Sequence, residues 1–352
     1  DKQVDSVCPY CGVGCLLTYK IKDNKILHVD GRDGPSNHER LCVKGRYGFD
    51  YAHHKGRLTK PLIRREDRPK DQVDIDAIDP NNPYELFREA TWEEALDKAA
   101  EGLKKIRDEH GSGALAGFGC AKGSNEEAYL LQKLVRVGLG TNNIDHCTRL
   151  CHSTSVVALM EMIGSGAVSN QVADVADAEV MIVIGANPTE NHPVAATFIK
   201  NAAHAPGKTL IVMDPKGNPL VRHAHHQLQF MTDSDIGLLN AMMQTIIEEG
   251  LTDDDFIAKR TTGFDELKEH LKDYTPEKIA PICGISAEKI REVARIYAKA
   301  KAAIIFWGMG ISQHTHGTDN ARALISLCLI AGQIGRPGTG LHPLRGQNNV
   351  QG

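Results

Sequence analysis

The stretch EVMIVIGAN, residues 179–187, decides the fold, because its unbroken apolar run predicts a β-strand that is buried on both faces. Two similar runs follow later in the chain, TLIVMDP at 209–215 and AAIIFWGMG at 302–310. Segments with apolar residues at helical spacing alternate with these strands. They lie at 193–205, 236–250, 286–300 and 319–335. We therefore expect an α/β fold with a doubly wound, Rossmann-like parallel sheet.

The chain upstream of this stretch predicts a separate N-terminal region. Residues 1–58 are rich in cysteine, glycine and charge, and LLTYKI and KILHVD alternate apolar and polar residues, as is typical of a β-hairpin. A connection rich in Pro, Asp and Arg follows. Thr91 with Glu94 then forms a capping box that predicts the start of a helix. A strand at 114–119 and a helix at 125–140 are expected after it.

The overall composition excludes two classes of partner. The 352 residues carry a formal net charge of -4, which argues against a nucleic-acid-binding surface. No apolar run approaches the length of about 18 residues that a membrane span needs. The N-terminus lacks the apolar core of a signal peptide, and the last residues, LRGQNNVQG, read as a polar loop. We expect a fragment of a longer protein, truncated at both ends.

The segment CPYCGVGC holds the densest cysteine motif of the chain. Cys8, Cys11 and Cys15 follow the spacing C-x2-C-x3-C, and Cys42 comes later in LCVKGR. Thiolates divided three plus one are typical of a 4Fe-4S cluster. A structural zinc ion is the alternative, although zinc sites usually pair C-x2-C with a second close pair. Lys44 is expected beside the cluster, the alternative being an ordinary surface lysine.

Polar loops follow the three apolar strands, at the positions where ligands bind in open parallel sheets. No G-x-G-x-x-G motif follows a strand and no P-loop is present. Each polar residue alone would more often be a helix cap or turn residue. Together the loops predict a site for a large polar cofactor that carries phosphates. The residues at these positions are Asn187, Asp214, Gly308, Gly310 and Gln313.

A third candidate site is DHCTRLCHSTS, residues 145–155. Cys151 and His152 lie at the start of a helical segment, where the helix dipole favours a thiolate. A buried Cys–His neighbour pair without further function is the alternative. The cysteines outside these motifs are expected to be core thiols. They are Cys120, Cys147, Cys283 and Cys328.

These motifs together resemble the molybdopterin-guanine-dinucleotide oxidoreductases, and among them the catalytic subunit of soluble, NAD-dependent formate dehydrogenases. The resemblance rests on CPYCGVGC, RLCHSTSVVAL, GANPTENHP, WGMGISQHTHGTDNARAL and GRPGTGLHPLRGQNNVQG, which span nearly the whole chain. It implies four divisions. They are a 4Fe-4S domain at 1–58, the first part of a discontinuous α/β domain at 59–146, a Rossmann-like pterin-dinucleotide domain at 147–346, and the return to the second domain at 347–352.

The resemblance also implies roles for individual residues. Cys8, Cys11, Cys15 and Cys42 would hold the cluster, and Lys44 would relay electrons between the cluster and a pterin. Cys151 would ligate molybdenum or tungsten, with His152 beside the metal and Arg345 holding the formate carboxylate. The residues expected to contact the bis-molybdopterin guanine dinucleotide are Lys44, Asn187, Asp214, Gly308, Met309, Gly310, Gln313, Gly346, Gln347 and Asn348.

The activity implied is the reversible two-electron oxidation of formate to CO2 at a metal centre with a terminal sulfido ligand. Further iron–sulfur and flavin or NAD-binding subunits are expected as partners, in the cytoplasm. A nitrate reductase of the same superfamily is one alternative, although such enzymes usually carry Met at the position of His152. A non-catalytic electron-transfer subunit is the other, and it would be expected to lack both the Cys–His pair and Arg345.

Overall fold

The computed structural model describes residues 2–74, 76 and 78–351. The chain forms two compact units. The larger unit contains the residues up to Gly48, the short segment Cys120–Ser124, and the residues from Cys147 onward. The smaller unit contains Phe49–Gly119 and Asn125–His146. The domain boundaries that the sequence suggests at 58, 146 and 346 stay a prediction.

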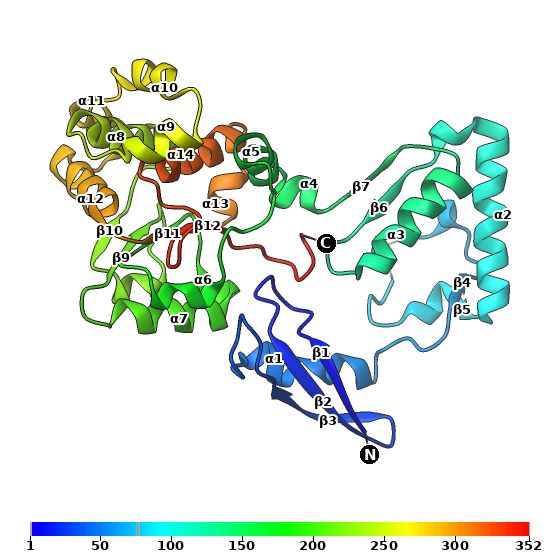
Figure 1. Ribbon diagram of the computed structural model, residues 1–352. Coiled ribbons are helices and arrows are strands. Elements are labelled where there is room, and N and C mark those ends of the chain that lie inside the picture. Colours follow the sequence, from blue (N-terminus) through cyan, green and yellow to red (C-terminus); the bar gives the residue numbers. More distant parts are fainter. Residues whose placement is uncertain (1, 75, 77, 352) are drawn as a thin grey trace. The chain divides into compact units, whose positions relative to one another are not determined.

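A five-stranded parallel sheet forms the centre of the larger unit (Figure 1), with the strand order β10-β9-β8-β11-β12. Every residue of β8 and β11 is buried, as the apolar runs predicted. β10 and β12 were not predicted, because each has only three or four residues. The strands are β8 (Val180–Ile184), β9 (Thr209–Met213), β10 (His226–Leu228), β11 (Ala303–Trp307) and β12 (Gly340–Pro343).

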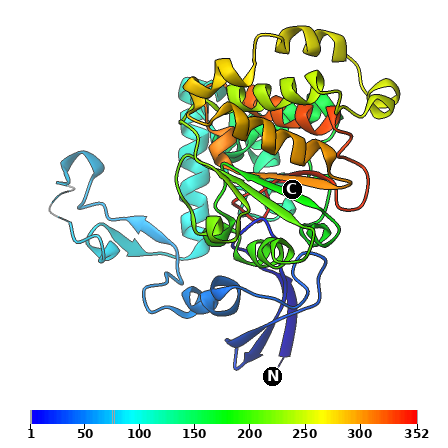
Figure 2. The same cartoon turned by 90° about the vertical axis from the view of Figure 1, so that its left-hand side faces the viewer.

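Helices cover both faces of this sheet, which confirms the doubly wound α/β fold (Figure 2). Alternate residues of β8 point to opposite faces: Ile182 packs in the core beneath α8 and α14, whereas Val183 packs in the core beneath α7. Burying each such side chain contributes about 1.5–3 kcal/mol. The predicted helices are α7 (Pro193–Ala203), α8 (Asp235–Glu248), α12 (Ala287–Lys299) and α14 (Gly317–Ile330). Three helices that were not predicted, α9 (Asp254–Arg260), α10 (Phe264–Leu271) and α11 (Pro276–Cys283), follow α8.

The N-terminal part of the larger unit is a three-stranded antiparallel sheet with the order β1-β2-β3. The predicted hairpin is confirmed as β2 (Leu16–Lys22) and β3 (Lys25–Gly31). Its two-residue turn, Asp23 and Asn24, has φ angles of 49° and 57°, which these two residue types tolerate best after glycine. β1 (Lys2–Val7) was not predicted, and the short helix α1 (Val43–Tyr47) follows the sheet.

The smaller unit is built around α2 (Trp92–His110). The predicted start is confirmed, because the Thr91 hydroxyl accepts a hydrogen bond from the Glu94 amide; the Glu94 carboxylate pairs with Arg88. The expected strand at 114–119 is shortened to β6 (Gly117–Gly119), which pairs with β7 (Ile144–His146). Besides short 3-10 turns, the unit also contains β4 (Leu62–Arg64), β5 (Phe87–Glu89), α3 (Asn125–Lys133) and a π-helical turn at Leu134–Gly138.

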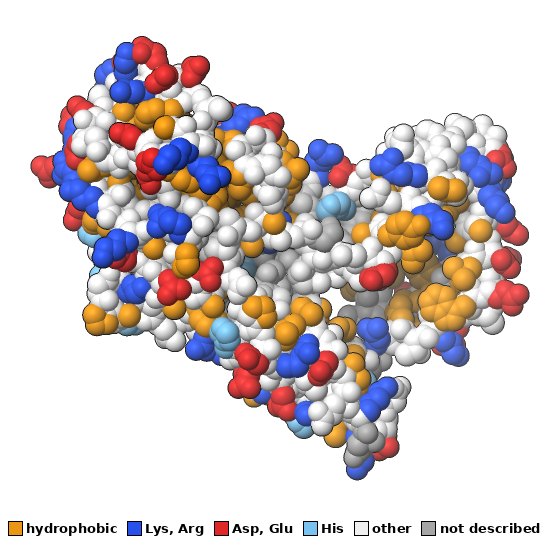
Figure 3. Space-filling model, in the orientation of Figure 1, with side chains coloured by type: hydrophobic (Ala, Val, Ile, Leu, Met, Phe, Trp, Pro, Cys, Tyr) orange, Lys and Arg blue, Asp and Glu red, His pale blue; other side chains and the backbone are white. Residues whose placement is uncertain are grey.

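The surface charge agrees with the composition. On the face of the larger unit shown in Figure 3, basic and acidic side chains are interspersed over the helices. Among the described residues, no helix is both long and apolar enough to cross a lipid bilayer.

Candidate active site

The four predicted cluster cysteines come together around one pocket. Cys8, Cys11 and Cys15 lie on the loop between β1 and β2, and Cys42 immediately precedes α1. All four line the same pocket as Lys44. The loop is closed by a hydrogen bond from the Cys8 amide to the Cys15 carbonyl, 2.8 Å long. The structure therefore brings the five residues together in the three-plus-one arrangement that the spacing predicted.

The chemistry of these thiols fits an iron–sulfur cluster. Burial, together with the neighbouring cysteine thiolates, raises the pKa of Cys8 and Cys11 and raises that of Cys15 to about 12. Four thiolates held this close repel one another, so the charged ligand form requires a compensating positive centre. Iron ions of a 4Fe-4S cluster supply that charge.

A second lysine, not expected from the sequence, approaches the same loop. The Lys122 ammonium group donates hydrogen bonds to the carbonyls of Pro9, at 3.2 Å, and Tyr10, at 2.7 Å. Its charge also lowers the pKa of Cys8 and Cys11, although burial outweighs this effect. Lys122 therefore holds the cysteine loop in place and places a positive charge beside it.

Cys151 is the last residue of the short helix α4 (Thr148–Cys151) and lies beside α13 (Met309–Ser312). Its Sγ is 3.7 Å from Met309 Sδ. Burial raises the pKa of Cys151, and Cys147 raises it further, whereas the Gly346 amide and Arg345 oppose the shift. The lowered pKa expected at a helix N-terminus is therefore not found, because burial dominates. The Gln313 amide nitrogen donates to the carbonyl of the neighbouring Leu150 at 2.6 Å.

His152 follows Cys151 and is fully buried. A chain of hydrogen bonds reaches its ring: Trp307 Nε1 donates to Ser155 Oγ at 2.8 Å, Ser155 Oγ lies 2.6 Å from Ser312 Oγ, and Ser312 Oγ lies 3.3 Å from His152 Nδ1. The indole N–H can only donate, so Ser155 accepts from Trp307. The chain can then run in one direction, with Ser155 donating to Ser312 and Ser312 donating to Nδ1. In that arrangement the ring hydrogen of neutral His152 lies on Nε2.

The His152 ring is neutral at ordinary pH. Burial lowers its pKa to about 4, with a further contribution from the charge of Arg345. Among the described residues, Nε2 has no hydrogen-bond partner. The Leu344 backbone lies near enough to raise the pKa of the ring slightly, so the imidazole is positioned between Ser312 and Leu344.

Arg345 is a buried arginine, with only 5% of its surface exposed. Its Nη2 donates to the Gly166 carbonyl, but Nε has no partner and no carboxylate forms an ion pair with it among the described residues. Burial lowers its pKa to about 10, so the guanidinium stays charged at neutral pH. A buried cation without a paired carboxylate is a receptor for an anion.

A cavity of about 230 Å³ lies beside Arg345. His192, between α6 (Pro188–Asn191) and α7, and His342, in β12, line it, and Gly12 reaches it from the cysteine loop. His192 Nε2 donates to the Arg345 carbonyl at 2.7 Å. The sequence did not single out either histidine, although each stands before a proline in a motif that carries the resemblance.

The strand-end residues lie along the carboxyl edge of the sheet. The Gly310 amide donates to the Gly185 carbonyl at 3.0 Å, so the loops after β8 and β11 meet where the strand order reverses. A Cβ atom on Gly308 or Gly310 would lie under 3 Å from Gly185, which explains the glycines. Asn187, at the start of α6 (Pro188–Asn191), has a buried Oδ1 without a partner among the described residues.

Asp214, after β9, uses its carboxylate within its own loop. Oδ1 accepts from the Lys216 amide at 2.8 Å and Oδ2 accepts from Asn218 at 3.4 Å. Burial raises the pKa of Asp214. The residue therefore lies at the predicted strand end, with part of its hydrogen-bonding capacity already used.

The segment after Arg345 contacts two other parts of the larger unit. The Cys147 thiol donates to Gln347 Oε1 at 2.8 Å, and the Asn348 amide donates to the Lys122 carbonyl at 3.3 Å. Cys147 is thus not the core thiol that was expected, and Cys120 is exposed. Each of these two cysteines directly follows a short strand, β6 or β7, and the local sequence does not show that the chain is accessible there. Cys283 and Cys328 are buried, as predicted.

The fold and the site define a class of protein: a doubly wound α/β domain, with polar loops at its topological switch point, joined to a small four-cysteine domain. Comparison with known families agrees. Residues 57–352 match the family described as Molybdopterin oxidoreductase, and residues 1–54 match the Molybdopterin oxidoreductase Fe4S4 domain. The chain belongs to the molybdopterin oxidoreductase family. The iron–sulfur interpretation of the four cysteines is thereby favoured over zinc.

Individual relatives are similar over the whole chain. It is 43% identical to the F420-dependent formate dehydrogenase subunit alpha of Methanocaldococcus jannaschii, covering all of this chain and 49% of the relative. It is 39% identical to formate dehydrogenase H of Escherichia coli, covering 47% of that protein. The chain thus spans about half the length of these relatives. In structure it resembles acetylene hydratase from Pelobacter acetylenicus, with a TM-score of 0.78 and 24% identity over 96% of this chain and 44% of that protein. This likeness supports the fold.

Proposed function

We propose that this chain carries the formate-binding site of a molybdopterin-dependent formate dehydrogenase, which oxidises formate reversibly to CO2. The observation that carries the proposal is Arg345, a buried guanidinium that no carboxylate of the described residues neutralises. Its charge and that of Cys151 affect each other's pKa, so the two groups lie close together. The names of two similar proteins specify formate as well.

Formate suits this arginine for a physical reason. The guanidinium is planar and can give two parallel hydrogen bonds to one carboxylate. Each hydrogen bond to a charged group contributes about 1.5–3 kcal/mol. Formate has one carboxylate and one C–H bond. Its two oxygens can accept both hydrogen bonds from the guanidinium while the C–H bond points away from Arg345.

His152 would orient the bound anion through the N–H of Nε2. Its pKa of about 4 makes the ring a weak base, so it stays neutral. Of the two roles considered for this residue, proton acceptor or hydrogen-bond donor, the low pKa and the Ser312 contact at Nδ1 favour the donor.

The residues fit the cofactors of the family. Cys151 would ligate the molybdenum or tungsten ion, which carries a terminal sulfido ligand and accepts the two electrons of formate when bound. Cys8, Cys11, Cys15 and Cys42 would hold the 4Fe-4S cluster, and Lys44 beside them would assist electron transfer between the pterin and the cluster. The residues proposed to contact the pterin guanine dinucleotide are Lys44, Asn187, Asp214, Gly308, Met309, Gly310, Gln313, Gly346, Gln347 and Asn348.

Further iron–sulfur and flavin subunits are proposed as partners, because similar proteins are named as alpha subunits. The expected NAD acceptor stays a prediction, since the names of two relatives specify F420. The cytoplasmic location stays a prediction too.

The test compares Arg345→Gln with the wild-type full-length enzyme. Formate-dependent reduction of a viologen dye should require at least about 100-fold more formate in the variant, because a bidentate charged contact is lost. Arg322→Gln, a surface arginine paired with Glu161, serves as the matched control. Both variants should retain about four iron ions and one molybdenum or tungsten per chain. An unchanged KM for formate in Arg345→Gln contradicts the proposal, and so does a wild-type enzyme that lacks both heavy metals.

A further inference from the structure

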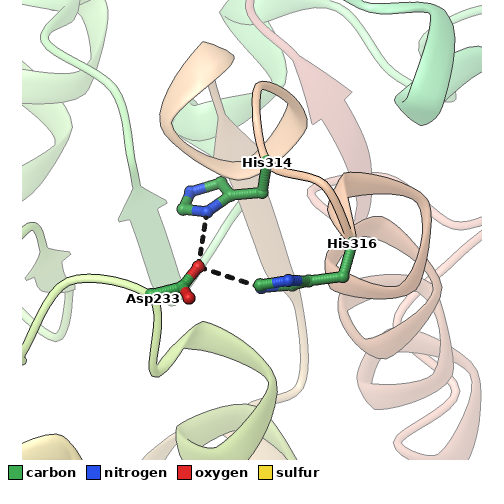
Figure 4. Close-up of side chains that lie close together, drawn as sticks. All are labelled: Asp233, His314 and His316. Carbon is green, nitrogen blue, oxygen red and sulfur yellow. Dashed lines mark hydrogen bonds and ion pairs between the residues drawn. The ribbon is translucent and has the colours of Figure 1, made fainter.

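Two histidines and an aspartate meet on the larger unit (Figure 4). Asp233 lies between β10 and α8, whereas His314 and His316 lie between α13 and α14. Asp233 Oδ1 is 2.9 Å from His314 Nδ1 and 3.2 Å from His316 Nε2. All three candidate ligand atoms lie within 4.8 Å of one another.

The His314 ring is held between two hydrogen-bond acceptors. Nε2 lies 2.7 Å from the Gly310 carbonyl, so this nitrogen carries a hydrogen. In a neutral ring, Nδ1 would then point its lone pair at the Asp233 carboxylate, which is unfavourable. The arrangement needs a positive charge at Nδ1, either a second proton or a metal ion. Metal-binding histidines commonly donate their other N–H to a backbone carbonyl in this way.

The surrounding charges favour a cation. Asp235, only 2% exposed, interacts electrostatically with both histidines. Among the described residues, no lysine or arginine forms an ion pair with Asp233 or Asp235. Two carboxyl groups therefore lie beside two imidazoles without a competing basic side chain.

We propose that Asp233, His314 and His316 bind a divalent transition-metal ion of the zinc class. Bonds of about 2.0–2.1 Å in a tetrahedral site separate the ligand atoms by about 3.3 Å. The two separations measured to Asp233 are within a few tenths of an ångström of this value. Two imidazoles and one carboxylate suit zinc better than magnesium or calcium, which prefer oxygen ligands. Water can complete the shell, because the Asp233 side chain is 67% exposed.

The ion would join two loops that are far apart in the sequence. The loop that carries Asp233 precedes α8. The loop that carries His314 and His316 follows α13 and also contains Gln313. None of its three ligands is proposed to bind formate, the cluster or the pterin dinucleotide, although His314 adjoins two proposed dinucleotide contacts, Gly310 and Gln313. Zinc binding can therefore be measured separately from the proposed activity.

The test is zinc binding by the full-length enzyme with its iron and molybdenum or tungsten in place. Titration with Zn2+ after dialysis against a chelator should show one site per chain in the wild type. Asp233→Asn should weaken binding at least tenfold, and the double variant His314→Gln, His316→Gln should abolish it. His223→Gln is the matched control, since His204 and His223 form a histidine pair of similar spacing without a carboxylate.

X-ray absorption at the zinc edge identifies the ligands independently of activity. Nitrogen and oxygen neighbours that disappear in the double variant support the site. A sulfur shell would place the zinc at the cysteines and overturn the proposal. Equal zinc binding by the wild type and Asp233→Asn, which is nearly isosteric and keeps the fold testable, overturns it as well.

Discussion

The backbone amide of Gly12 donates a hydrogen bond to the carbonyl of Arg345 at 3.1 Å. This contact joins the loop of the cluster cysteines to the loop of the proposed formate-binding arginine. A Cβ atom at residue 12 would lie 2.4 Å from the same carbonyl oxygen, so only glycine permits the approach.

Gly12→Ala should therefore displace the Arg345 backbone. We expect a loss of about 1–3 kcal/mol of stability and a rise of at least tenfold in the KM for formate. Thermal unfolding and dye-reduction kinetics measure the two effects. Gly217→Ala is the control, because nothing lies within 4 Å of its added Cβ. Wild-type kinetics in Gly12→Ala would show that the two loops are not coupled.

Ser312→Ala should release the His152 ring from its assigned tautomer. Losing one hydrogen bond of about 1 kcal/mol should lower kcat/KM for formate roughly five- to tenfold. Ser312→Thr keeps the hydroxyl and should restore most of the activity. Ser153→Ala, whose hydroxyl bonds only to the Arg149 carbonyl among the described residues, should have no effect. Full activity in Ser312→Ala argues against the hydrogen-bond chain.

His342 should make the protein less stable in acid. Burial, together with the charges of His192 and Arg345, lowers its pKa to about 3, below the ordinary value of about 6.5. The folded state therefore binds this proton less readily than the unfolded state, and stability present above pH 6.5 is lost as the pH falls toward 3. The loss is at most about 1.4 kcal/mol per pH unit from this group.

The measurement for His342 is the unfolding midpoint between pH 7.5 and 4.5. His342→Gln cannot titrate, so its midpoint should fall less steeply with acid than that of the wild type. Parallel curves for the two proteins would mean that His342 is protonated equally in both states.

Lys122→Gln should lower the reduction potential of the cluster. The ammonium group stabilises the reduced, more negative state. Removing it should lower the potential by roughly 70–140 mV, as expected for a unit charge about 5–10 Å away at an effective dielectric constant near 20. Redox titration followed by electron paramagnetic resonance measures the shift. Lys122→Arg keeps the charge and should stay close to the wild type. A potential unchanged in Lys122→Gln would assign this lysine a purely structural role.

Much of the fold could be predicted because its signals are local. The apolar runs of β8, β9 and β11 and the alternation of β2 and β3 each lie within one short segment. β12 carries the sequence GLHP, and its strand character comes only from pairing with β11. Such pairing depends on the tertiary structure and leaves no periodic pattern.

The candidate site divides in the same way. The spacing of Cys8, Cys11 and Cys15 is local, so the cluster loop could be predicted. The contact between Ser312 and His152 joins residues 160 positions apart, and the contact between His192 and Arg345 joins residues 153 apart. These partners become visible only when the sheet brings the strand-end loops together.

The interleaving of the two units has a thermodynamic consequence. The segment Cys120–Ser124, which carries Lys122, belongs to the larger unit but is bounded by the two pieces of the smaller one, 71 and 22 residues long. Closing flexible loops of these lengths would cost about 4 and 3 kcal/mol of chain entropy. Ordering the smaller unit removes much of that freedom beforehand. Folding of the smaller unit therefore lowers the entropy cost of placing Lys122 against the cysteine loop, through chain connectivity alone.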